Sequence, residues 1–180
     1  MAVIETTQIA PAGTWTADPI HSSIGFSVKH MGVATFTGSF ADYAATLIGG
    51  DEPKLEGVAK VENIITQDEN LNVHLLSPEF FDADRFPELR FEATRFDRDG
   101  NELVVRGDLT LRGETRPVEL RGTISDPIDD PYGRQRIGLE LETTVDRREF
   151  GLNWQAQLPS GGDVLGYDVK LIARLSLVKA

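Results

Sequence analysis

An aspartate, a histidine and a serine stand close together near the start of the chain, and these residue types form the triads of serine hydrolases. Asp18, His21 and Ser22 lie in one short segment. In a triad the serine attacks, the histidine takes its proton and the carboxylate orients the imidazole. Here His21 and Ser22 are neighbours in a segment predicted to be extended, so their side chains point to opposite faces. The chain also contains no Gly-x-Ser-x-Gly nucleophile elbow. We therefore predict no catalytic residues, and we expect His21 or Ser22 to anchor a strand or to offer a polar group to a ligand.

A metal site is the second chemistry to consider. The chain has 3 histidines and no cysteine, which excludes thiolate ligands and disulfides. His21 and His30 are an odd number of positions apart, so a regular strand would place them on opposite faces. A bulge at Gly25 would bring them together, but a third ligand such as His74 would have to come from a distant element. We predict no metal site, while the sequence leaves a ligand or metal role for His21 or His30 open.

Two further segments combine charged residues with turn residues. The acidic segment 126–131 (DPIDDP) lacks the ligand spacing of a calcium loop, and we expect a solvated turn. Segment 147–154 (RREFGLNW) contains no nucleophile or general base of the expected kind. It indicates a structural corner that packs Phe150 and Trp154, with Arg147 or Arg148 paired to a carboxylate.

Length and charge limit the class of protein. A chain of 180 residues with 40% hydrophobic residues is long enough for one domain with a core. The 18 basic and 29 acidic residues give a net charge of −11, which disfavours nucleic acid and anionic membranes as partners. We see no secretory signal and no apolar run of about 18 residues. We therefore expect a cytoplasmic protein with no stable membrane insertion.

Period-2 alternation predicts the elements that position these residues. In residues 15–30, Ile20, Ile24, Phe26 and Val28 share one parity, while the other parity carries His21, Ser23, Ser27 and Lys29. Similar alternation occurs seven more times, which predicts about eight strands. Those further strands lie near residues 34–40, 55–62, 89–94, 103–111, 118–124, 137–145 and 169–177. Glycines inside several strands favour a coiled sheet that closes on itself, and residues 1–12 lack a pattern and predict a flexible N-terminal arm.

One segment has helical spacing instead. Leu71, Leu75 and Leu76 follow acidic residues suited to a helix N-terminus, and residues 77–78 (SP) end the pattern. This insertion, which also carries Phe80 and Phe81, is either a plug at a barrel mouth or a helix on the outside of the sheet. The sequence gives the two alternatives equal support.

Four motifs in series resemble the YceI-like family of lipid-binding proteins. The first is DPIHS at 18–22 with FSVKH at 26–30 and GSF at 38–40. The second is LLSPEFFD at 75–82 with FPELRF at 86–91, the third is GDLTLRGETRPV at 107–118, and the fourth is RREFGLNW at 147–154. The resemblance runs from about Gly13 to Val178 and implies a YceI-like domain over residues 13–180.

The resemblance implies an all-β fold, an eight-stranded antiparallel lipocalin-like β-barrel with a short helical insertion. It implies a pore that holds a long-chain amphiphile such as a polyisoprenoid, an isoprenoid quinone or a fatty-acid-type lipid, for transport or storage and with a link to the stress response. It implies no enzyme and no cofactor besides the bound lipid. Two rival functions stay open: an enzyme acting on a lipid-like substrate in the same cavity, and a structural or interaction barrel with a packed core.

The inward parity of the predicted strands supplies the candidate pore lining. We expect Leu76 and Phe81 of the insertion to gate the mouth, and a homodimer is compatible with exposed edges. The remaining ligand-binding candidates are Phe26, Val28, Phe36, Phe40, Phe91, Leu109, Leu111, Leu120, Leu139, Leu141 and Leu171.

Overall fold

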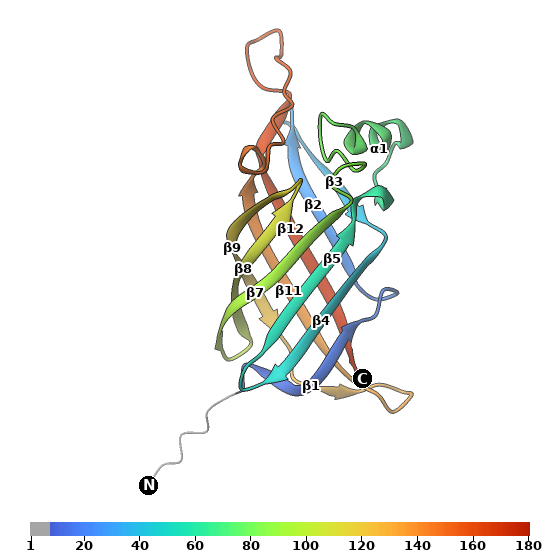
Figure 1. The fold of residues 1–180 in the computed structure, drawn as a ribbon, viewed down its shortest axis with the longest axis vertical. Helices are drawn as coiled ribbons and strands as arrows, with labels where there is room; N and C mark the ends of the chain where they lie inside the picture. The colour runs from blue at the N-terminus through green and yellow to red at the C-terminus, as the bar shows by residue number, and fades with distance from the viewer. Residues whose placement is uncertain (1–7) are drawn as a thin grey trace.

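The computed structural model describes residues 8–180 and shows a closed, eight-stranded antiparallel β-barrel with one short helix at one end (Figure 1). The predicted fold class is confirmed. The strands are β1 (Ala10–Ala17), β2 (Ser23–His30), β3 (Ala34–Phe40), β4 (Tyr43–Gly50), β5 (Lys54–Lys60), β6 (Ile64–Ile65), β7 (Glu88–Asp99), β8 (Glu102–Leu111), β9 (Glu114–Ile124), β10 (Ile128–Asp129), β11 (Gln135–Asp146) and β12 (Leu165–Lys179). Two 3₁₀ helices, η1 (Val61–Asn63) and η2 (Arg147–Phe150), complete the fold.

Two of the barrel's staves are interrupted. The long strand β12 pairs with β11 on one side and with both β1 and β2 on the other. Strands β1 and β2 therefore form one stave, and β3 and β4, which pair with them, form the next. The wall then runs through β5, β7, β8 and β9 back to β11, which closes the barrel.

The strand predicted within residues 15–30 is present as β2, but the alternation did not predict that its approach contains the end of a separate strand, β1, and a turn. The Asp18 carboxylate accepts a hydrogen bond from the Ile20 backbone N–H at 3.0 Å, which is the geometry of an Asx turn. Ile20, which the alternation placed on the inner face, lies in this turn and is 84% exposed. The acidic segment 126–131 is only partly the expected turn, because it contains strand β10; the turn follows β10, with Asp130 accepting from the backbone N–H of Tyr132 and of Arg134.

The N-terminal arm expected over residues 1–12 lies mostly outside the described residues. Its last part is not an arm, because Ala10 is buried and pairs with Gly50 of β4. The Pro11 carbonyl accepts a hydrogen bond from the Trp15 indole N–H at 2.9 Å. It also lies where a side chain on Gly49 would be, so only glycine permits this approach. The wall therefore begins before the predicted domain boundary.

Strand β1 and the C-terminus lie at one end of the barrel (Figure 1), and the inward side chains at this end are almost completely buried. We call this packed layer the floor. Its members share nearly complete burial and come from β1, β4, β8, β11 and β12: Trp15, Leu47, Val105, Leu139 and Leu177. Close packing of this kind leaves no room for a ligand.

The opposite end carries the insertion, residues 66–87 between β6 and β7, with helix α1 (Glu69–Leu76). The Asp68 carboxylate caps the helix by accepting from the backbone N–H of Asn70 and of Leu71. The predicted helix is confirmed. Because Leu71 and Leu75 line the barrel's interior cavity, the structure favours the plug over a helix on the outer surface.

Candidate ligand-binding cavity

Beneath the insertion lies a cavity of about 440 Å³, which we call the upper cavity. This volume is within the usual range of ligand pockets. Its lining is apolar except for His30, Thr35, His74 and Arg147. The remaining lining residues are Phe26, Val28, Ala34, Phe36, Phe40, Leu71, Leu75, Phe80, Phe81, Leu89, Leu111, Val145, Leu152, Trp154, Val164, Leu165, Val169 and Leu171.

An aromatic cluster forms one side of this cavity. The Phe26 ring lies 6.1 Å from Phe36, 5.9 Å from Phe40 and 6.4 Å from Phe81, measured between ring centroids. Phe40 and Phe81 meet edge to face at 6.1 Å, a favourable arrangement for aromatic pairs. Since Phe81 belongs to the insertion, the cluster joins the insertion to strands β2 and β3.

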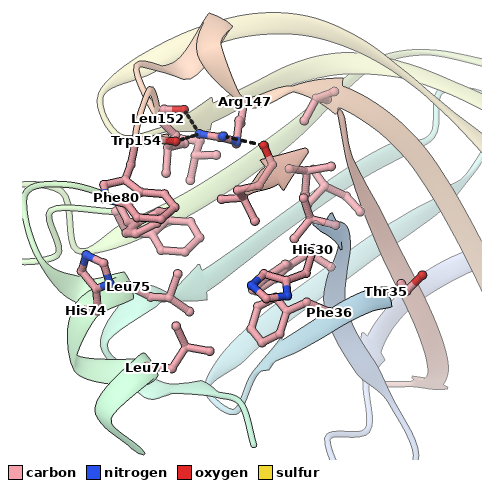
Figure 2. Close-up of a pocket in the computed structure, with 18 of the residues that line it drawn as sticks. His30, Thr35, Phe36, Leu71, His74, Leu75, Phe80, Arg147, Leu152 and Trp154 are labelled. Atoms are coloured by element: carbon pink, nitrogen blue, oxygen red, sulfur yellow. Dashed lines mark hydrogen bonds between the residues drawn. The ribbon is translucent and has the colours of Figure 1, made fainter. Parts of the chain in front are cut away.

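A second aromatic cluster closes the roof (Figure 2). The His74 ring of α1 contacts Phe80 at 4.9 Å and Trp154 at 5.8 Å, both edge to face. His74 also hydrogen-bonds through Nε2 to the Glu79 carboxylate at 2.5 Å. Through Trp154 the insertion packs on the corner, residues 147–154, so the roof is built from two segments far apart in the sequence.

Arg112, in the turn between β8 and β9, ties these two segments together. Its guanidinium donates to the Pro78 carbonyl of the insertion at 2.8 Å and to the Gly151 carbonyl of the corner. One side chain thus links three elements at the rim of the cavity. Moving the insertion away from the corner would break at least one of these two hydrogen bonds.

The corner holds the cavity's buried guanidinium. Arg147 donates to the backbone carbonyls of Leu152, Trp154, Leu165 and Gly166 at 2.7 to 3.2 Å. Figure 2 shows Arg147 at the cavity wall with its bonds to this chain's carbonyls. Burial lowers the pKa of the Arg147 guanidinium from its ordinary value. This residue fixes the path of the chain from η2 to β12.

The sequence prediction for the corner was right in part. Phe150 is fully buried, and Arg148 pairs with Asp146 at 2.7 Å, which lowers the pKa of that carboxyl through the hydrogen bond from Arg148. Arg147 instead donates hydrogen bonds to carbonyl groups, because the backbone of residues 152–154 and of residues 165–166 surrounds its guanidinium. The sequence does not show which distant carbonyls converge on it.

Below the upper cavity lies a second, apolar space of about 100 Å³, which we call the lower cavity. Both cavities are lined by Phe40, Leu89 and Leu171, and we call these three residues the constriction. The other lining residues of the lower cavity are Ile24, Gly25, Ala45, Leu55, Glu56, Gly57, Val58, Ala59, Phe91, Leu109, Val118, Leu120, Leu141, Ile172, Ala173 and Leu175.

Most residues predicted from the inward parity face one of these cavities. The upper cavity is lined by Phe26, Val28, Phe36, Phe40, Phe81, Leu111 and Leu171. The lower cavity is lined by Phe91, Leu109, Leu120 and Leu141, together with Phe40 and Leu171.

Two predicted ligand-binding residues, one expected to line the pore and one expected to gate its mouth, face neither cavity. Leu139 is 1% exposed and belongs to the floor. Parity shows only that a side chain points inward, and it does not show whether the barrel is packed at that level. Leu76 packs against the core beside the cavity. On a helix, residues four apart share a face, so Leu71 and Leu75 point into the cavity and the next residue turns away.

Sequence reasoning missed several lining residues. The corner and the start of β12 contribute Leu152, Val164 and Leu165, and His30 faces the cavity from the end of β2 (Figure 2). His30 shares its parity with Phe26 and Val28, so the alternation contained this signal. The corner residues carry no periodic signal, because their segment is irregular.

The Asp18, His21 and Ser22 group lies outside both cavities. His21 Nδ1 meets the Asp18 carboxylate at 2.7 Å, while the Ser22 hydroxyl accepts from the Ser176 backbone N–H at 2.9 Å. The expectation that Ser22 anchors the strand is confirmed. The hydrogen bonds from His21 and then from Arg136 hold the pKa of Asp18 well below its usual range. Among residues 8–180, no three His, Asp or Glu side chains gather as a metal site would require.

Comparisons with known proteins agree with this architecture. A sequence model described as the YceI-like domain matches residues 15–177. The chain belongs to the YceI-like family. A UPF0312 protein of Staphylococcus aureus is 35% identical over 167 residues, covering 88% of this chain and 94% of that protein. The Protein YceI of Shigella flexneri is 32% identical over 136 residues, covering 73% of this chain and 71% of that protein.

Solved structures share the fold of this YceI-like chain at low identity. Burkholderia cenocepacia BcnA superposes with a TM-score of 0.73 at 17% identity, covering 91% of this chain and 99% of that chain. A domain of Saccharophagus degradans described as polyisoprenoid-binding gives a TM-score of 0.67 at 13% identity, covering 94% and 100% of the two chains. Within residues 8–180, no helix has the length and apolar character needed to cross a membrane.

Proposed function

We propose that this YceI-like protein binds a long-chain amphiphile in its barrel and carries or stores it without chemical change. The upper cavity is the observation that carries the proposal, because it is a ligand-sized apolar space inside a barrel whose floor is packed. The polyisoprenoid-binding domain of Saccharophagus degradans shares the fold. A polyisoprenoid, an isoprenoid quinone and a fatty-acid-type lipid all have the chemistry that such a lining favours.

Binding would be driven by removing the chain from water. Each buried methylene contributes about 0.8 kcal/mol, and association and ordering cost several kcal/mol in return. The few polar groups on the lining belong to the upper cavity, where the His30 ring faces the interior from the end of β2 (Figure 2). The Thr35 hydroxyl instead accepts a hydrogen bond from Lys29 at 2.9 Å on the exposed side of β3. His30 suits the polar end of an amphiphile, while the apolar walls suit its chain.

Native mass spectrometry with organic extraction, on protein purified without detergent, tests this proposal. We expect one long-chain lipid per protein, released by the extraction. Repeated absence of such a mass, together with no uptake of added palmitate, ubiquinone or a C20 prenol, would overturn it. The packed structural or interaction barrel, which the sequence left open, predicts that second result.

A matched pair of variants on β12 ties the bound lipid to the cavity. Val169 lines the upper cavity, whereas the next residue, Lys170, pairs with Glu142 on the outer face at 3.2 Å. Val169→Phe should fill part of the cavity and reduce lipid occupancy, and Lys170→Phe should leave it unchanged. Equal occupancy in both variants would place the lipid elsewhere.

A separate experiment tests the proposal that the protein does not change the lipid chemically. His30 faces the upper cavity, whereas His21 lies in an exposed turn outside it. Lipids recovered after incubation with the protein should have unchanged masses by liquid chromatography and mass spectrometry. A mass change that His30→Gln abolishes would instead establish the rival enzyme.

A further inference from the structure

The constriction divides the barrel interior into two unequal spaces. Phe40 ends β3 at the point where that stave breaks, Leu89 lies near the start of β7, and Leu171 lies within β12. All three side chains border both the upper and the lower cavity. The polar lining side chains lie above this level, because the lower cavity's one charged lining residue, Glu56, is exposed at the outer surface.

The lower cavity exists because small residues replace large ones on the inner face. Gly57 alternates with the buried Leu55 and Ala59, so its missing side chain would point inward. A Cβ built on Gly57 would meet no atom within 4 Å. Its partner on β4 is Ala45, and Ala173 lines the same space from β12. The gap at Gly57 therefore results from the small residues that the sequence places on the inner face at this level.

An unfilled apolar space of this kind favours a hydrocarbon occupant. Protein interiors are normally close-packed, so an empty space leaves its lining without contacts. Water needs several polar partners to enter a cavity, and the side chains around Gly57 offer none. The tail of a lipid would supply the missing contacts.

We propose that the tail of the bound chain passes the constriction and ends in the lower cavity against Gly57, so that this small space selects the chain length. The inference rests on the proposed function, since it needs a lipid with its polar end in the upper cavity. Each methylene that enters the lower cavity raises affinity by about fourfold. A chain too short to pass Phe40 gains nothing from that space.

Binding of a homologous series of straight-chain fatty alcohols to the whole 180-residue protein tests the inference. Chains of about 8 to about 20 carbons are compared by competition with a fluorescent fatty acid, since each methylene changes affinity measurably. Gly57→Val adds a side chain that suits a strand and fills the lower cavity. The control is Gly138→Val, because Gly138 is exposed on β11 and a Cβ there makes only ordinary contacts, 3.5 Å from the nearest atom.

We expect Gly57→Val to weaken binding of the longest chains by about tenfold. Chains that end above Phe40 should keep their affinity, and Gly138→Val should match the unsubstituted protein throughout. Ala173→Val, which enters the lower cavity from β12, should repeat the effect and replaces Gly57→Val if that variant does not fold. If long chains bind both lower-cavity variants as tightly as the unsubstituted protein, the inference is wrong. If no alcohol, prenol or fatty acid binds the unsubstituted protein, the proposed function itself fails.

Discussion

The two ends of this barrel follow the same alternation and are filled in opposite ways. At the floor, Trp15, Leu47 and Leu177 are almost completely buried on the neighbouring strands β1, β4 and β12. At the roof, inward residues such as Phe36 and Val169 leave about 440 Å³ unfilled beneath the insertion. Alternation thus decides which side chains point inward, whereas side-chain size and the covering segments decide whether the space becomes core or cavity.

The largest expected effect comes from the floor. Trp15→Ala removes a fully buried ring and its hydrogen bond to the Pro11 carbonyl, so we expect a loss of about 3–5 kcal/mol in the free energy of unfolding. Urea denaturation measures it. Under conditions where the variant stays folded, lipid affinity should be unchanged. A loss below about 1 kcal/mol would contradict the packed floor.

The corner should show the next largest effect. Arg147→Lys cannot reproduce the guanidinium's bonds to four backbone carbonyls, and unpaired buried carbonyls are costly, so we expect a loss of about 2–3 kcal/mol in the free energy of unfolding. Arg148→Lys is the matched control, because its exposed pair with Asp146 is worth about 0–1 kcal/mol. If urea denaturation gave equal losses of unfolding free energy for the two variants, the buried guanidinium of Arg147 would add no stability.

A lining residue of the upper cavity should separate stability from binding. Phe36→Ala removes a ring that already borders empty space, so we expect only about 1 kcal/mol of lost stability and about tenfold weaker lipid binding. Ile20→Ala, at an exposed turn position, should change neither quantity. Calorimetric titration with a C20 prenol measures the affinity. Unchanged affinity of Phe36→Ala would place the chain outside the upper cavity.

The smallest expected effect is a pH dependence of stability that arises from Asp18, between β1 and β2. The folded state holds the pKa of Asp18 below its ordinary value through His21 and Arg136. The stabilisation is therefore present above that ordinary value, about 3.9, and is lost as the pH falls toward the folded-state pKa. Asp18→Asn should lower the Tm at pH 7, with a difference that shrinks below about pH 4. Asp51→Asn, in an exposed turn, should leave the Tm unchanged, and a pH-independent difference for Asp18→Asn would contradict the ion-pair explanation.

Much of the wall could be predicted because alternation is a local property. The inward sets of β8 and β11 are buried as expected, including Leu103, Val105 and Ile137. Alternation failed where a strand ends. Ile20 has the parity of an inward residue, but it lies in a turn, where its side chain is exposed. It also failed at β4, where the outward residues Ala44 and Ile48 are apolar like the inward ones, so that the strand shows no polar and apolar alternation.

The site was less predictable than the wall, for a physical reason. Which inward residues border empty space depends on the sum of all side-chain volumes at one height of the barrel. Leu139 and Leu141 have the same type and parity, yet Leu139 belongs to the floor and Leu141 borders the lower cavity. Trp154 and Arg147 owe their places to an irregular segment, and only the fold reveals their partners.

The central claim, that a lipid occupies the roof half and leaves the floor untouched, is tested most directly by methyl NMR. Protein labelled at the methyl groups of leucine and valine is titrated with a C20 prenol. We predict shift changes at Val28, Leu75 and Val169, which line the upper cavity, and none at Leu47, Val105 and Leu177 of the floor. Changes confined to the floor, or to methyl groups on the outer surface, would contradict the account.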